Sequence, residues 1–224
     1  MLVSNNYDNE TNVIYVEENE SSNSSFLIAS FLWEALNVHK AEVMTVTFHN
    51  SVQHYQHLIS KITQNVLNVF NKPKITNLNP ADFIDCDNLE VMKLLSSIQD
   101  FCNQRADPNL FIVIDDISYV HLLSSLKDCF HFIRYCSKLI ATYPKLKMVI
   151  GCHTSSDDEE LNIISKYLHH WSKFNLIVTP LLSGFSSDVT GHLTVVSKTG
   201  FQNRINKYRY KVDDKKISIN PYIL

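Results

Sequence analysis

Glycine is scarce in this chain: only four of its 224 residues are glycine, and the first of them is Gly151. Nucleotide-binding α/β domains place a glycine-bearing loop after their first strand, because backbone N–H groups must wrap a phosphate there. The corresponding segment here, residues 17–25, reads Glu-Glu-Asn-Glu-Ser-Ser-Asn-Ser-Ser, with three carboxylates and neither glycine nor lysine. A conventional phosphate-binding loop is therefore excluded, and we predict that this first loop forms no site for ATP.

Closely spaced cysteines and long apolar runs are missing as well. The five cysteines are scattered and never spaced Cys-x-x-Cys, which argues against a disulfide framework and against a thiolate zinc site. No apolar run reaches the length of a membrane span, and the N-terminus lacks a signal-peptide pattern. We expect a cytoplasmic protein with reduced thiols, with the nucleus as a second location and no membrane association. Residues 1–11 match no element and are predicted to be disordered.

Apolar residues make up 45% of the chain, which is enough for one sizeable core. The periodicity predicts strands at residues 12–16, 43–48, 66–70, 110–116, 147–151 and 174–179. Helices are predicted between them at 26–36, 51–62, 89–102, near 122 and at 126–140, and a further helix carries Leu161, Ile164 and Leu168. Residues 73–80 are predicted to be irregular. Ser24 or Ser25, and Ser156 or Asp157, are the expected helix caps.

The pattern changes after residue 184, where strands are predicted at 192–197, 208–212 and 215–219 with turns between them. Strands that alternate with helices indicate a parallel sheet, whereas consecutive strands joined by turns indicate antiparallel pairing. We therefore predict one α/β domain over residues 1–224. Its sheet is mostly parallel and flanked by helices, with antiparallel strands at the C-terminal edge.

The strand at residues 110–116 ends in two carboxylates, Asp115 and Asp116. Such a pair can organise a magnesium ion beside a bound nucleotide. It can equally cap the helix that begins near Ser118, and the missing phosphate loop favours this structural role. We expect no metal, no cofactor and no catalytic residue.

Four histidines occur in two pairs, His54 with His57 and His169 with His170. A metal site needs three or four converging ligands, and no such set with a familiar spacing is present. These histidines are predicted to be solvated surface residues.

The C-terminal hairpin carries the strongest concentration of positive charge. Arg209 and Lys211 should share one face of their strand, while Tyr208, Tyr210 and Val212 take the other. The candidate nucleic-acid-binding residues are Arg209, Lys211, Lys215 and Lys216. Phosphates would be attracted to them, although an alternating charged face is also typical of any solvated edge hairpin.

The order of several short motifs resembles the Elongator complex protein 6 family. The motifs span nearly the whole chain: Ser25–Leu32, His54-Tyr55, Val113–Ile117, Asp157–Glu160, Gly184–Leu193 and Tyr208–Ser218. The resemblance implies a RecA-like domain that lacks ATPase signatures. It also implies a non-catalytic subunit in a heterohexameric ring with Elongator subunits four and five. The ring joins the catalytic subcomplex in modifying wobble uridines of tRNA, and it contacts tRNA.

Two other classes of protein remain open at this point. The chain could be an active or degenerate P-loop-like NTPase, or a pseudo-ATPase subunit of a DNA-repair recombinase complex. Direct nucleotide binding to the purified protein would identify the first class, and the subunits that co-purify would identify the second.

Overall fold

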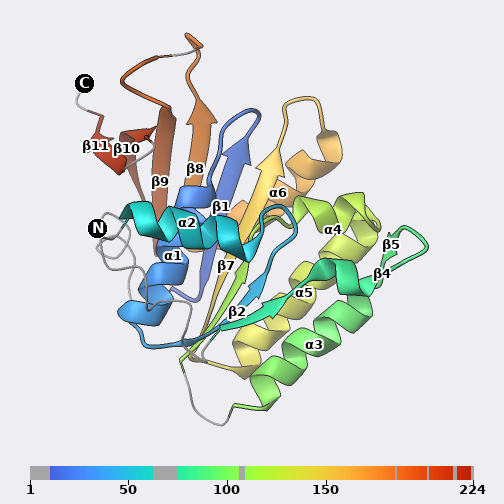
Figure 1. The fold of residues 1–224 in the computed structure, drawn as a ribbon. Coiled ribbons are helices and arrows are strands. Elements are labelled where there is room, and N and C mark those ends of the chain that lie inside the picture. The colour runs from blue at the N-terminus through green and yellow to red at the C-terminus, as the bar shows by residue number, and fades with distance from the viewer. Residues whose placement is uncertain are drawn as a thin grey trace.

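The computed structural model describes residues 11–62, 75–105, 109–184, 186–200, 202–213 and 216–222. Within these residues, nine strands form one sheet in the order β11-β10-β9-β8-β1-β7-β6-β2-β3 (Figure 1). The strands are β1 (Val13–Asn19), β2 (Glu42–Val46), β3 (Ile75–Leu78), β6 (Leu110–Ile114), β7 (Leu146–Thr154), β8 (Phe174–Pro180), β9 (Gly191–Thr199), β10 (Gln202–Val212) and β11 (Ile217–Pro221). Neighbouring strands from β3 to β8 are parallel, and β8 to β11 pair antiparallel. The predicted fold class is confirmed.

Helices cover both faces of the parallel part of the sheet. They are α1 (Ser25–Asn37), α2 (Val52–Ile62), α3 (Val91–Asn103), α4 (Ser118–Leu122), α5 (Leu126–Thr142) and α6 (Glu159–Trp171). Helices α1 and α2 share one apolar core with the first face of the sheet, and α3 to α6 share a second core with the opposite face. Burial on both faces explains why β6 reads Leu-Phe-Ile-Val-Ile without a polar residue. None of the described helices is both long enough and apolar enough to cross a membrane.

Helix α1 is buried on most sides, as its sequence predicts. Its charged residue Glu34 is itself only 3% exposed, and its carboxylate lies 3.2 Å from the His39 ring. A buried carboxylate requires such a polar partner. The helix is therefore held between the sheet and α2 along most of its surface.

Several short elements between residues 75 and 89 were not predicted. Strand β3 lies within residues 73–80, which were expected to be irregular, and it pairs with β2 at the sheet edge. Its side chains are largely half-buried because only one neighbour covers it, so its apolar pattern is weak. The two-stranded hairpin of β4 (Ile84–Asp85) and β5 (Asn88–Leu89) turns through Cys86 and Asp87 at φ of 48° and 64°. Turns of this kind usually contain glycine, which is why the sequence gives no signal for it. The strand predicted at 66–70 lies outside the described residues.

The predicted cap of α1 has the right position without the expected hydrogen bond, and the predicted cap of α6 was wrong. Ser24 occupies the N-cap position of α1, but its side chain makes no capping hydrogen bond. The side chain of Asn23 instead accepts from the backbone N–H of Ser25 at 2.9 Å. Helix α6 is capped by Asp158, one residue later than expected, which accepts from the N–H of Leu161 at 2.9 Å.

Candidate functional site

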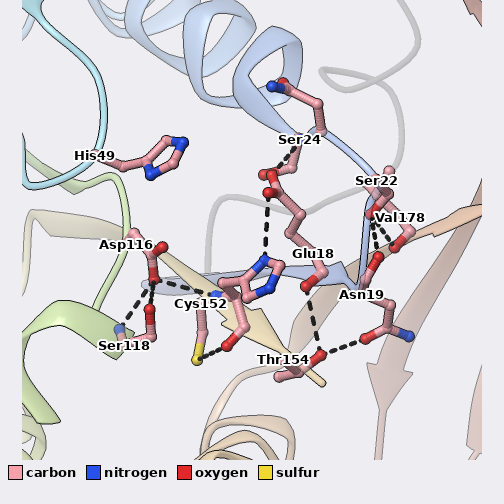
Figure 2. A network of polar contacts seen from close by, with 12 residues as sticks. Glu18, Asn19, Ser22, Ser24, His49, Asp116, Ser118, Cys152, Thr154 and Val178 are labelled. Carbon is pink, nitrogen blue, oxygen red and sulfur yellow. Dashed lines mark hydrogen bonds and ion pairs between the residues drawn. The ribbon is translucent and has the colours of Figure 1, made fainter. Parts of the chain in front are cut away.

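The carboxyl ends of β1, β7, β6 and β2 meet at one edge of the sheet, which is where parallel α/β sheets bind nucleotides. Polar side chains from these strand ends gather there, together with the first turn of α1. Figure 2 shows part of this arrangement, with Glu18, Ser24, Asp116 and Thr154 from separate elements lying around one region. This edge is the candidate site.

The connection from β1 to α1 is short and firmly attached to the sheet. Strand β1 runs to Asn19, three residues beyond its predicted end, and the backbone turns at Glu20 with φ of 51°. The N–H of Glu20 donates to the carbonyl of Thr154 at 2.8 Å. The hydroxyl of Ser22 donates to the carbonyl of Val178 at 3.0 Å (Figure 2). The segment that would wrap a phosphate is thus shortened and tied to β7 and β8.

The carboxylate of Glu18 lies where an anionic ligand would bind at the start of α1. It accepts a hydrogen bond of 2.5 Å from the backbone N–H of Ser24, and it lies 3.5 Å from Nδ1 of His153. Free N–H groups at a helix N-terminus attract phosphates and carboxylates alike, through the same partial positive charge. Glu18 therefore supplies from within the chain the negative charge that a phosphate would bring.

The space that remains at the site is very small. The cavity among Glu18, Ser24, Asn50, Asp115 and their neighbours measures about 10 Å³. A single water molecule needs roughly 10–15 Å³ on the same kind of measure. The cavity has room for about one water molecule and cannot take a triphosphate in this conformation.

Asp115 holds the loop between β2 and α2. Its two oxygens accept hydrogen bonds from the backbone N–H groups of Phe48, His49 and Asn50 at 2.7, 3.1 and 3.0 Å. The hydroxyl of Tyr55 donates to the same carboxylate at 3.1 Å. Burial raises the pKa of Asp115 above its ordinary value, and the three backbone donors oppose that shift. Four donors are thereby satisfied by one side chain.

Asp116 has the capping role that the sequence suggested for the pair. One of its oxygens accepts from the backbone N–H of Ser118 at 2.9 Å and from the Ser118 hydroxyl at 2.6 Å. The same oxygen accepts from the N–H of His153 at 3.1 Å, which ties the end of β6 to β7. Only Asp116 reaches α4, because Asp115 points to the β2–α2 loop. In the part of the chain that the structure describes, no group of three or more His, Cys, Asp or Glu side chains is placed to hold a metal ion.

The thiol of Cys152 lines this edge but is unsuited to nucleophilic chemistry. Its pKa is raised well above the usual value, first by burial and then by the nearby charge of Asp116. A thiol that stays protonated is a poor nucleophile. Cys152 is therefore a core residue.

Glu17 points to the opposite face of the sheet from Glu18 and is paired there. It is 9% exposed, and its carboxylate contacts Nε2 of His169 on α6. The Ser165 hydroxyl donates to it at 3.2 Å, and Tyr15 donates to Ser165 at 3.0 Å. Of the three acidic residues in the loop sequence, Glu17 and Glu18 thus belong to strand β1 and have partners, and only Glu20 is exposed.

The prediction of solvated histidines is wrong for two of the four residues. His169 is half-buried against Glu17, because β1 places that carboxylate beside the last turn of α6. His54 is also half-buried, and its pKa is lowered, first by burial and then by His57. His57 and His170 are exposed, as predicted.

The C-terminal hairpin has the predicted separation of faces. Tyr210 is buried in the core shared with α1, and Tyr208 and Val212 pack against that core. On the other face, the Arg209 guanidinium lies 4.5 Å from the centre of the Tyr222 ring. The Lys211 ammonium lies 3.3 Å from Asp213.

Of the remaining candidate residues, Lys216 is exposed beside the turn and Lys215 lies outside the described residues. Two further residues on the face of Arg209 were missed, Lys207 and His192. Counting back two residues from Arg209 identifies Lys207 as a member of that face. His192 lies directly opposite Arg209 on β9, and no sequence signal reveals that register.

A sequence model of the family described as Elongation complex protein 6 matches residues 62–214. The chain belongs to this family. It is 31% identical over 115 residues to the human Elongator complex protein 6 and 30% identical over 116 residues to the one from Xenopus laevis. Each of these two alignments covers 48% of this chain and 43% of the relative. The chain therefore matches less than half the length of these curated relatives.

The fold has its own counterpart among solved structures. A KaiC-like protein from the hyperthermophilic archaeon Pyrococcus horikoshii superposes with a TM-score of 0.65 at 12% identity, covering 96% of this chain and 91% of that one. The predicted RecA-like fold is confirmed. The Elongation complex protein 6 match includes the carboxylates after β6 and the basic strand β10, and it begins after Glu18.

Proposed function

We propose that this member of the Elongation complex protein 6 family acts as a non-catalytic subunit of Elongator. The observation that carries this proposal is the carboxylate of Glu18 on the first turn of α1. That group already supplies the anionic partner of the first turn of α1, and this supports a RecA-like domain that binds no phosphate there. Asp115 and Asp116 then serve to hold loops instead of a metal ion.

The same proposal includes an assembly and a substrate. The chain joins Elongator subunits four and five in a heterohexameric ring, which works with the catalytic subcomplex on wobble uridines of tRNA in the cytoplasm, with the nucleus as a second location. Family membership and the RecA-like fold support the assembly. The basic hairpin, with Arg209, Lys211, Lys215 and Lys216, is the proposed tRNA contact.

The cellular test is the level of wobble-uridine modification in cells that lack this protein. We expect the modification to be lost and to return when the wild-type chain is supplied. Normal modification in the deleted cells would contradict the proposed function as a whole.

Charge reversal at the four hairpin residues should weaken tRNA binding by the assembled ring, and it should make the tRNA affinity less dependent on salt concentration. Ring assembly should survive these substitutions.

Two measurements address the other classes of protein. Titration calorimetry of the purified chain with magnesium-ATP should show no binding. A micromolar dissociation constant that is abolished by substitutions in residues 17–25 would instead identify an NTPase with a divergent loop. Recombinase subunits that co-purify in place of Elongator subunits would identify a DNA-repair complex.

A further inference from the structure

Among the residues that the structure describes, no helix core covers one face of the antiparallel part of the sheet. The apolar residues of β8, β9 and β10 that enter a core all face α1 and α2, and within the described residues none of the strands β8 to β11 contributes to the core under α3 to α6. Figure 1 shows these strands at the sheet edge farthest from α3 and α5. We call the uncovered side the open sheet face, and its central residues are His192, Thr194, Ile205, Lys207, Arg209 and Tyr222.

The open sheet face is electropositive. Strands β8 to β11 contain no Asp or Glu and five Lys or Arg residues. By strand alternation four of the five lie on the open sheet face, whereas Arg204 shares the other face with Tyr208 and Tyr210. Lys207, Arg209 and Lys211 follow one another at every second position of β10, so they form a row spaced by about 7 Å along the strand. Lys211 pairs with Asp213, whereas Lys207 and Arg209 are exposed and form no ion pair with any other described residue. A linear row of cations fits a linear polyanion.

Three planar side chains lie together on the open sheet face, those of Arg209, His192 and Tyr222. The Arg209 guanidinium lies over the Tyr222 ring at 4.5 Å. The His192 ring meets Tyr222 edge-on, at 5.7 Å between centroids and an angle of 68°. His192 and Arg209 are also directly opposite each other in the β9–β10 register. Stacking on Tyr222 orients the guanidinium before any ligand binds, which reduces the entropy lost on binding.

We infer that the open sheet face binds single-stranded nucleic acid. Phosphates would contact Lys207, and an unstacked base would lie against the outer side of the Arg209 guanidinium. Single strands are bound by positively charged surfaces on which bases stack against aromatic rings or guanidinium planes. An acidic peptide would satisfy the charges equally well, but it would leave the stacked Arg209, His192 and Tyr222 without a planar partner. The inference rests on the proposed function only for the identity of the nucleic acid, which would be an unpaired part of tRNA.

The test uses the full chain and a short fluorescently labelled oligouridylate, with binding measured by anisotropy over a range of salt concentrations. The double variant Lys207→Glu with Arg209→Glu should bind at least about tenfold more weakly than wild type. Each lost phosphate contact should make the slope of log K against log salt shallower by about 0.7. Arg209→Lys keeps the charge but loses the planar group, and it should also weaken binding.

The matched control is Arg134→Glu with Lys138→Glu, which makes the same change in net charge on the exposed face of α5. This control should bind oligouridylate nearly as wild type does, and both double variants should keep the wild-type melting temperature because all four side chains are exposed. An equal loss in both double variants would show that net charge alone matters and would overturn the inference. So would an unchanged affinity of the Lys207/Arg209 variant, or displacement of oligouridylate by polyglutamate more readily than by unlabelled RNA.

The proposed function fails independently of this result. If the Lys207/Arg209 variant binds oligouridylate normally while cells without the protein lose wobble-uridine modification, the open sheet face is excluded and the Elongator role stands. If modification is normal in those cells but the variant loses binding, the Elongator role is excluded and binding of single-stranded nucleic acid by the open sheet face stands.

Discussion

A single carboxylate determines what the N-terminus of α1 can bind. Glu18 accepts from the N–H of Ser24 and lies 3.5 Å from Nδ1 of His153, so its carboxylate has polar partners on two sides. Its neighbour Glu17 has the opposite orientation, because successive side chains of a strand point to opposite faces. The two acidic residues therefore have separate roles, one at the α1 terminus and one in the buried contact with His169.

Glu18→Gln should destabilise the protein by about 0.5–2 kcal/mol, because a charged partner at a helix N-terminus is replaced by a neutral amide. The matched control is Glu20→Gln, which removes the same charge from the exposed position two residues later. The control should change the free energy of unfolding by less than about 0.5 kcal/mol. Urea unfolding of wild type and of the two variants measures these differences in the free energy of unfolding. Equal effects would show that Glu18 contributes only to the net charge of the loop.

The lowered pKa of His54 makes stability depend on pH. Burial disfavours the charged imidazole in the folded protein, so the folded-state pKa lies below the unfolded value of 6.5. The unfolded state then binds the proton more tightly. Stability should decline as the pH falls through 6.5, and the loss should be complete below the folded-state pKa.

His54→Leu should remove this part of the pH dependence, since a leucine cannot take up the proton. The exposed His57 lies one turn away on the same helix, and His57→Leu is the control. Thermal unfolding measured between pH 7.5 and pH 5 should give a flatter profile for His54→Leu than for the control. Parallel profiles for wild type and both variants would rule out His54 as the titrating group.

Among the secondary-structure elements, β6 and the loops that follow it connect the fold to the site. Its five residues are all buried, and the two carboxylates after it bind loops from different parts of the chain. Asp115 fixes the start of the segment that leads into α2, and Asp116 fixes α4 and β7. The loops at this edge of the sheet are therefore hydrogen-bonded to the two carboxylates where an NTPase would need room for its ligand.

Asp115→Ala should cost at least about 2 kcal/mol of stability, because three backbone N–H groups and the hydroxyl of Tyr55 lose their acceptor in a buried place. Tyr55→Phe removes one of the four donors and should cost about 0.5–1.5 kcal/mol. Denaturant unfolding measures both changes. If Asp115→Ala were no more destabilising than Tyr55→Phe, water would be replacing the carboxylate and the loop would not depend on it.

The sequence was sufficient to predict the long elements of this fold and the short helix near Leu122, and it missed β3 and the β4–β5 hairpin. Strand β6 and helices α1, α3 and α5 have strong apolar patterns, since each is packed against the sheet or within it. Strand β3 and the β4–β5 hairpin are short and partly exposed, so their patterns are weak. The sequence did not reveal that Glu18 lies at the start of α1, because the predicted strand ended at residue 16 and β1 extends to Asn19. The meeting of His192 with Arg209 depends on strand pairing, which local sequence does not contain.

At the scale of the whole molecule, the two halves of the sheet differ in what covers them. The parallel half has helices on both faces, whereas among the described residues the antiparallel half shares an apolar core with helices on one face only. Large apolar side chains are also exposed outside the sheet, with Leu122 at 73% and Leu182 fully exposed. Single exposed apolar side chains are common on monomeric proteins, so these two do not define an interface. The assembly proposed above rests on family membership and the RecA-like fold.

The chain should therefore gain stability from Elongator subunits four and five. A partner that binds only the folded state stabilises it by about 2.7 kcal/mol at a concentration one hundred times its dissociation constant. For a domain of this size such a change corresponds to a rise of roughly 5–10 °C in melting temperature. Differential scanning fluorimetry of the chain, alone and with increasing amounts of the two subunits, measures the shift. The shift should grow with partner concentration, because binding is governed by mass action, and an equal mass of serum albumin should produce none. A purified chain that is monomeric, and whose melting temperature does not change when both subunits are added, would contradict the assembly.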